Sequence, residues 1–243
     1  MRDFHVHTTF SDGANTPEEM VQAAIKLGME AIGFSDHAYT PFDESYCIPL
    51  GRMDEYRRTI AALKEQYAGK IQIYCGIEQD LYATSSTAGF DYVIGSVHYV
   101  RAGSEYLPVD ESAEVQKQAV ARHFGGDFYA FAERYFEAVA QLPEQTGASL
   151  LGHLDLVAKF NQREQLFDER HPRYVRAWQQ AVDTLLMHGI PFEINTGAIS
   201  RGYRTLPYPN PDMQAYIRAH GGQFVYSSDS HRADTLCYGF AEK

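Results

Sequence analysis

Seven short apolar segments alternate along the chain with longer segments of helical character. The length of the apolar segments is typical of buried strands, and they cover residues 3–7, 31–35, 71–78, 92–98, 150–153, 191–195 and 223–227. Apolar positions recur with helical spacing over residues 17–27, 53–67, 127–141, 174–188 and 211–219. Because strands and helices alternate, the pattern predicts an α/β fold with a parallel sheet. Seven strands separated by helices favour closure into a barrel.

The predicted helix boundaries carry capping signals. Thr16 precedes the first helix as a side-chain cap, and Pro17 occupies its first turn. Gly28 follows that helix, and Gly189 and Gly221 follow the last two. These residues set the expected limits of the helices.

Composition and charge narrow the class of protein. A length of 243 residues with 44% hydrophobic content predicts one domain over residues 1–243. The sequence has neither an apolar run of about 18 residues nor a signal-peptide pattern, so we expect a soluble, cytoplasmic protein without a membrane partner. A net charge of −11 argues against a nucleic-acid partner, although bound metal cations could reverse the charge locally. The three cysteines form no CxxC pair, which argues against a disulfide framework and a thiolate metal site.

Six of the ten histidines follow the predicted strands at their carboxyl ends. These ends meet on one face of a βα barrel, where active sites of such folds are built. His5 and His7 point to the same side of the first strand because side chains alternate along a strand. The other candidate ligands are Asp12, His37, Glu78, His98, His153, Asp229 and His231.

Taken singly, most of these motifs have ordinary explanations. Two histidines on a strand occur for packing, and Asp12 lies in a Ser-Asp-Gly sequence typical of a turn. Their convergence at six of seven strand ends favours metal binding. Nine ligands are too many for one ion, and nitrogen and oxygen donors suit Zn, Mn or Fe. Glu78 can bridge two ions, an arrangement that clamps phosphoryl oxygens, so hydrolysis of a phosphate ester is the leading chemistry.

As a set, these motifs resemble the polymerase and histidinol phosphatase (PHP) superfamily. Within it, the Gly33-to-His37 segment, the sequence Gly-Ile-Glu ending at Glu78 and the strand beginning at Glu193 look most like the histidinol-phosphatases. The resemblance implies a distorted (β/α)7 barrel of the PHP type with three divalent metal ions. It implies hydrolysis of L-histidinol phosphate in histidine biosynthesis, through a hydroxide that bridges two metals.

The resemblance also implies a partition of the ligands among the three ions. His5, His7, Glu78 and Asp229 would hold the first ion. Glu78, His98 and His153 would hold the second, and Asp12, His37 and His231 the third.

For substrate binding and proton transfer, the sequence leaves several candidate residues. Lys159 and Arg201 lie in loops of the predicted active face and could contact the phosphate of a small phosphate monoester, beside His37. Lys and Arg side chains are usually exposed to solvent without such a role. Arg101, Arg163 and Arg204 are alternative candidates for the phosphate contact. Catalysis would use Glu78, with His231, Asp155 or a water molecule as the proton donor to the leaving alkoxide.

Three other functions fit parts of the pattern. Another PHP enzyme, such as a nucleotide phosphatase, a phosphotyrosine phosphatase or an exonuclease, would keep the same ligands. A non-catalytic metal-binding module would be expected to lose some of them, and none is missing. An amidohydrolase-like enzyme would share the histidines of the first strand, but Glu78 and the Asp229-to-His231 motif favour PHP. The sequence ends soon after that motif, so we expect that the helix closing the barrel is supplied earlier or that the sequence is truncated.

Overall fold

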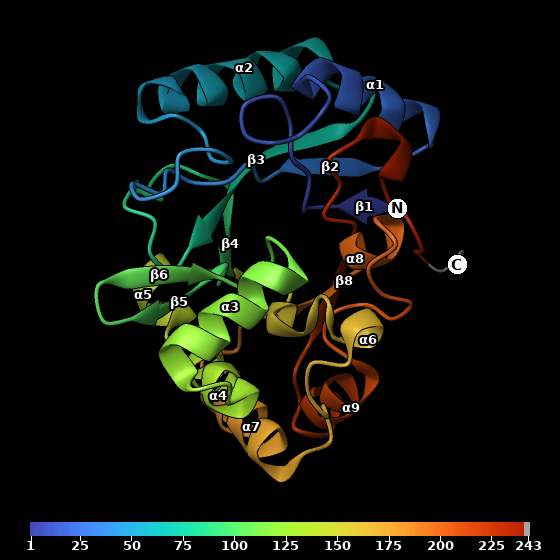
Figure 1. Cartoon of the computed structure of the whole chain (residues 1–243). Helices are drawn as coiled ribbons and strands as arrows, with labels where there is room; N and C mark the ends of the chain where they lie inside the picture. Colours follow the sequence, from blue (N-terminus) through green and yellow to red (C-terminus); the bar gives the residue numbers. More distant parts are fainter. Residues whose placement is uncertain (241–243) are drawn as a thin grey trace.

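Seven parallel strands form the centre of the computed structural model, which describes residues 1–240 (Figure 1). They are β1 Arg2–Asp3, β2 Ala31–Phe34, β3 Gln72–Asp80, β4 Tyr92–Ser96, β7 Leu150–Leu151, β8 Phe192–Asn195 and β9 Phe224–Ser227. Their spatial order is β1-β2-β3-β4-β7-β8-β9, and every neighbouring pair is parallel. The predicted α/β class and seven-strand barrel are confirmed.

The barrel is nearly closed between its first and last strands. β1 and β9 share no ladder, but Val6 and Ser230 form an isolated parallel bridge. The backbone N–H of His7 donates to the Ser230 carbonyl at 2.9 Å, and the Ser230 N–H donates to the His5 carbonyl at 3.0 Å. These two bonds join the segments that carry the first and last predicted ligands.

Helices flank the barrel on both sides. The longer ones are α1 Pro17–Lys26, α2 Met53–Gln66, α3 Ala113–Phe124, α4 Phe128–Val139, α7 Pro172–Leu186 and α9 Pro211–Ala219. α1 and α2 lie against β1 to β3, and the others lie on the opposite side (Figure 1). Shorter helices are α5 Leu142–Thr146, α6 Asn161–Glu164 and α8 Gly197–Ser200, with 3-10 turns η1 Leu50–Arg52, η2 Leu156–Ala158 and η3 Ala233–Thr235. Among residues 1–240, no helix is long and apolar enough to cross a bilayer.

The five predicted helices are confirmed, and their ends differ from the predicted ones by at most two residues. Thr16 and Glu19 form a reciprocal capping box at α1, as the polar start of that helix predicts. The sequence reading missed α3 and the hairpin of β5 Tyr99–Ala102 and β6 Glu105–Pro108. The hairpin turns at Gly103, which has a φ of 62°. The expectation about a helix that closes the barrel concerns the end of the sequence, and residues 241–243 lie outside the described residues.

Several strands end earlier than predicted. β1 stops at Asp3 and β7 at Leu151, so His5, His7 and His153 lie beyond the regular ladders. Their backbone N–H groups donate to side chains or to single residues of neighbouring segments, as when the His153 N–H donates to Glu193 Oε2 and the His7 N–H to the Ser230 carbonyl. Alternating polarity predicted the ligands but not this local departure from regular pairing.

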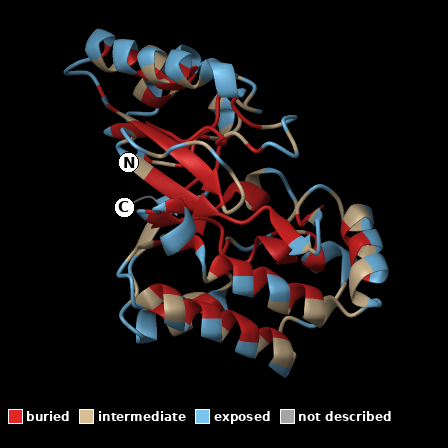
Figure 2. Cartoon of the chain, turned by 90° about the vertical axis from the view of Figure 1, so that its left-hand side faces the viewer, coloured by how far each residue is buried: buried red, intermediate tan, exposed pale blue. Residues whose placement is uncertain are grey.

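The core surrounds the strands, and most strand residues are buried (Figure 2), although β9 is partly exposed. The Tyr92 side chain reaches from β4 across to β1 and β2, and its hydroxyl donates to the carbonyls of Phe4 and Phe34 at 2.7 and 3.0 Å. Gly33 and Gly76 make room for this ring, because a Cβ at either position would lie within 2.5 Å of a Tyr92 atom. The barrel below the strand ends is therefore filled rather than hollow.

A buried carboxylate strengthens the junction between β1 and β9. Asp3 accepts hydrogen bonds from the backbone N–H groups of His5, Ser228 and Cys237 at 3.3, 3.1 and 3.1 Å, and also from the Ser228 hydroxyl. These bonds link the start of the chain to the segment after the last strand. They replace the missing β1–β9 ladder.

We expect Asp3→Asn to lower the free energy of unfolding of the metal-free protein by about 2 kcal/mol, because an amide nitrogen would face the Cys237 N–H and leave a buried donor unpaired. Urea denaturation measures the change. The exposed Asp54→Asn variant is the control and should stay within about 0.5 kcal/mol. Equal stability of the two variants would contradict the role given to Asp3.

Candidate metal centre

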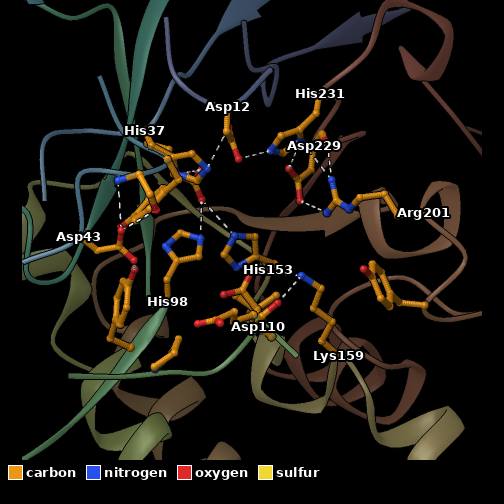
Figure 3. A pocket seen from close by; sticks show the side chains of 18 residues that line it. Asp12, His37, Asp43, His98, Asp110, His153, Lys159, Arg201, Asp229 and His231 are labelled. Atoms are coloured by element: carbon orange, nitrogen blue, oxygen red, sulfur yellow. Dashed lines mark hydrogen bonds and ion pairs between the residues drawn. The ribbon is translucent and has the colours of Figure 1, made fainter. Parts of the chain in front are cut away.

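Nine side chains gather at the carboxyl ends of the barrel strands, around the centre drawn in Figure 3. They are His5, His7, Asp12, His37, Glu78, His98, His153, Asp229 and His231. All nine were singled out from the sequence. Seven of them are buried, whereas Asp12 is exposed and His231 is partly exposed.

The Glu78 carboxylate, at the end region of β3, lies in the middle of the cluster. Its Oε2 is 3.1 Å from His5 Nε2 and 3.0 Å from His37 Nδ1. Its Oε1 is 3.0 Å from His153 Nε2 and 3.5 Å from His98 Nε2. Burial by itself opposes ionisation, but His5, His37 and His98 hold the pKa of Glu78 well below its ordinary value. The geometry is that of an ionised carboxylate able to bridge two cations.

Two further carboxylates face imidazoles on the open side of the cluster. Asp229 Oδ1 lies 3.4 Å from His7 Nε2. Asp12 Oδ2 lies 3.2 Å from His231 Nε2, and its Oδ1 lies 3.7 Å from His37 Nε2. Burial opposes ionisation of Asp12, but His37 and His231 lower its pKa. Both carboxylates are therefore placed to provide anionic oxygen ligands.

The nine residues form four overlapping groups whose donor atoms lie within 4.8 Å of one another. The groups are His7-Asp12-His37-His231, His5-His7-Asp229, His5-Glu78-His153 and His37-Glu78-His98. The first contains the trio expected for the third ion, with His7 added. The pair expected to share the second ion, His98 and His153, falls into separate groups. The groups overlap, and His98 and His153 both face Glu78 Oε1, so the partition among three ions stays a prediction.

Several of the candidate ligand side chains have buried atoms without a hydrogen-bond partner, as expected for a site that binds cations. Among the described residues, His5 Nε2, both ring nitrogens of His7, Glu78 Oε2 and His153 Nδ1 are buried and make no hydrogen bond. Buried polar atoms without partners are costly, which a cation held between them would offset. Burial together with His231 and His37 lowers the pKa of His7 to about 3, so its ring is neutral and keeps a lone pair. The site suits several divalent ions with nitrogen and oxygen ligands.

A second buried carboxylate shapes the loop that carries Asp12. Asp36 accepts from the Thr8 N–H at 2.7 Å and from the Ser11 hydroxyl at 2.6 Å. The next turn passes so close to this segment that a Cβ at Gly13 would lie 2.5 Å from Thr8 N. The Ser-Asp-Gly turn predicted from the sequence is thereby fixed against the end of β2.

Arg201 is bound to the outer edge of the centre. Its Nη2 donates to Asp229 Oδ2 and its Nη1 to the Asp229 carbonyl, both at 2.9 Å. Asp229 has a φ of 49°, an uncommon conformation for a residue other than glycine that is found mostly where function constrains the backbone. Burial by itself opposes ionisation of Asp229, but Arg201 and His5 hold its pKa well below its ordinary value. Arg201 and the carboxylate thus keep each other ionised.

A cavity of about 370 Å³ opens beside the centre. Both cations predicted to meet a phosphate, Lys159 and Arg201, line it and approach from one side in Figure 3. Lys159 Nζ donates to the carbonyl and the carboxylate of Asp110 at 2.8 and 3.2 Å. The loop after β2 contributes Asp43 and Tyr46 to the wall. The cavity therefore combines metal donors, two cations and further carboxylates.

Four candidates from the sequence, one carboxylate and three arginines, lie outside the lining of the cavity. Asp155 is fully buried, and its Oδ2 accepts from Arg204 Nη1 at 3.3 Å and from the Asn210 N–H at 3.2 Å. Burial raises the pKa of Asp155 to about 6, although Arg204 opposes the shift. Within the described part of the chain, the cavity lining contains neither Asp155 nor the competing cations Arg101, Arg163 and Arg204. Asp155 is thus held by Arg204 and Asn210 outside the lining of the cavity.

Sequence reasoning missed several acidic residues around the centre. Asp43, Asp110 and Glu111 line the cavity, and Glu193 and Asp80 lie behind His5 and His98. Glu193 and Asp80 could have been found, because a charged residue inside an apolar strand is rarely buried without a partner. The acids of the cavity wall belong to loops, where an exposed carboxylate is ordinary.

Comparisons with known proteins agree with this geometry. Residues 3–197 match the family described as the PHP domain. A probable histidinol-phosphatase of Deinococcus radiodurans is 29% identical over 99% of this chain and 90% of its own length. The histidinol-phosphatase of Bacillus subtilis is 26% identical over 98% and 96%.

A solved structure from Lactococcus lactis shares the fold. It is a histidinol phosphate phosphatase complexed with zinc, L-histidinol and phosphate, and it superposes with a TM-score of 0.70 at 23% identity, over 96% of this chain and 86% of that one. The family match spans most of the chain and includes seven of the nine candidate ligands, all but Asp229 and His231. This chain belongs to the PHP domain family.

Proposed function

We propose that this chain is a metal-dependent phosphomonoesterase that hydrolyses L-histidinol phosphate to L-histidinol and phosphate in histidine biosynthesis. The observation that carries the proposal is the cavity of about 370 Å³ in which metal donors adjoin Lys159 and Arg201. A volume of that size suits a small molecule. The relatives from D. radiodurans and B. subtilis carry the same activity in their names, and the L. lactis protein was solved with both products.

The nine clustered residues would hold several divalent ions, with Glu78 shared between two of them. Bound there, the ions would activate water as the nucleophile and neutralise charge on the phosphate. Arg201 and Lys159 would bind the phosphate oxygens and orient the ester for in-line attack. Because Asp155 is bound to Arg204 away from the cavity, the proton for the leaving alkoxide would come from His231 or from water in the cavity.

The opposite charges of the cavity wall favour histidinol phosphate over other small phosphate esters. Asp43, Asp110 and Glu111 line the same cavity as the two cations. A substrate with a phosphate at one end and an ammonium group at the other matches this distribution. An exonuclease, by contrast, would have to bind a polyanion with a protein of net charge −11.

The first test is phosphate release from L-histidinol phosphate beside nucleotides, phosphotyrosine and sugar phosphates, with Zn²⁺, Mn²⁺ or Fe²⁺ added. We expect kcat/KM for histidinol phosphate to exceed the others by at least about a hundredfold, since charged groups at both ends contribute to binding. A chelator should abolish release. Equal or greater activity on another ester would leave the metal centre in place and reject the substrate.

Glu78→Ala should remove bound metal from adjacent positions and abolish turnover, because both carboxylate oxygens face several imidazoles. Metal content by mass spectrometry and phosphate release measure the two effects. His123→Ala, which alters a histidine on α3 outside the centre, should keep full metal content. A Glu78 variant with full metal content and normal activity would reject the shared-ligand assignment.

Arg201→Ala should mainly raise KM, by about tenfold to a hundredfold, because a charge-assisted contact with the phosphate is worth about 1.5–3 kcal/mol. Steady-state kinetics with histidinol phosphate measure the change. Arg232→Ala is the control, since Arg232 is exposed and pairs with Asp234. If KM were the same in both variants, Arg201 would not bind the phosphate.

A further inference from the structure

Glu193 is a buried charge on a barrel strand that supplies none of the nine candidate ligands. It lies on β8, between Phe192 and Ile194, and only 1% of its surface is exposed. An ionised carboxylate in such a position is costly unless it is compensated by specific partners. Its partners therefore indicate why the fold keeps it.

The two oxygens of Glu193 bind groups from two other segments of the centre. Oε1 lies 2.6 Å from His5 Nδ1. Oε2 accepts from the His153 N–H at 2.9 Å and from Asn195 Nδ2 at 3.1 Å. Asn195 Nδ2 also lies 3.4 Å from Asp229 Oδ2. One carboxylate thus touches the imidazole of one candidate ligand and the backbone of another.

The bond to His5 decides which ring nitrogen is free. With Nδ1 donating to Glu193, Nε2 is the ring nitrogen that faces Glu78 Oε2, 3.1 Å away, and it can offer a lone pair to a cation that displaces its proton. Nε2 is buried and makes no hydrogen bond among the described residues. A histidine that binds a metal commonly donates its other ring N–H to a carboxylate, which sets its orientation and increases its basicity.

We infer that Glu193 is a positioning residue of the metal centre, which holds His5 with Nε2 as the ligand atom and fixes the backbone of His153. The ion concerned would be the one that the His5-Glu78-His153 group holds. The inference rests on the proposed metal centre and does not depend on the identity of the phosphate ester. It gives the sixth strand of the barrel a role in the site.

A purely structural role for Glu193 would have different consequences. Asp3 provides the comparison, because it is equally buried, lies two residues from His5 and accepts hydrogen bonds from three backbone N–H groups. It binds the His5 backbone and not its ring. Replacing each carboxylate by an amide therefore separates support of the backbone from control of the imidazole.

The test measures zinc binding by the full-length Glu193→Gln, Glu193→Ala and Asp3→Asn variants, using competition with a chromogenic chelator. We expect Glu193→Ala to weaken one zinc ion by about 10- to 100-fold, the range typical for loss of such a carboxylate. The remaining ions should change by less than about threefold. Glu193→Gln should recover part of the affinity, because its amide oxygen can still accept from His5 Nδ1.

A second readout avoids metal and activity altogether. In the metal-free protein labelled with ¹⁵N-histidine, the His5 Nδ1–H proton should show the downfield shift of a short hydrogen bond to a carboxylate, in the wild type and in Asp3→Asn. That signal should change in Glu193→Ala. Circular dichroism at the same temperature checks that each variant is folded. If Glu193→Ala does not fold, Glu193→Gln, which has nearly the same shape as the native residue, replaces it in both measurements.

Three results would overturn the inference. They are equal weakening of every zinc ion in the Glu193 variants, unchanged zinc affinity in them, or the same selective loss in Asp3→Asn. Absence of activity on histidinol phosphate would reject the proposed substrate but leave these outcomes unaffected. The two proposals therefore fail separately.

Discussion

The buried Glu78 carboxylate, surrounded by imidazole rings, is the interaction on which the rest of the structure depends. A charge in the interior of a barrel is tolerated only when fixed partners surround it. Here the partners come from four separate segments, which carry His5, His37, His98 and His153. The barrel must close for these imidazoles to reach one carboxylate, so fold and site depend on the same geometry.

Buried carboxylates outside the nine candidate ligands make this closure possible. Asp3 joins the first strand to the segment after the last, and Asp36 fixes the loop that carries Asp12. The regular β-ladders of β1 and β7 end before the candidate ligands. Beyond them, side-chain oxygens accept the hydrogen bonds of backbone N–H groups that no neighbouring strand pairs. Such acceptors hold irregular backbone in place at the face of the barrel, where the chemistry requires it.

The cavity beside the centre is lined by both cationic and anionic side chains. Lys159 and Arg201 are already paired with carboxylates, the former with Asp110 and the latter with Asp229. Each cation is thereby held near the wall before a phosphate arrives, which lowers the cost of orienting it on binding. The filled interior formed by Tyr92 lies beneath, so the cavity belongs to the loops and strand ends rather than to the barrel itself.

The sequence by itself determined the alternation of strands and helices, the α/β class and the identity of nine clustered side chains, because these depend on local periodicity and on which face of a barrel the strand ends share. His5, His98 and His231 could be placed on one face of the barrel on that ground alone. Tertiary structure decided the rest. Helix α3 and the β5–β6 hairpin depend on packing against distant segments, and the grouping of the donors depends on how loops turn inward beyond the strands. The separation of Asp155 from the cavity and the contact of Glu193 with His5 join residues about 50 and 190 positions apart, and local pattern carries no information about contacts over such distances.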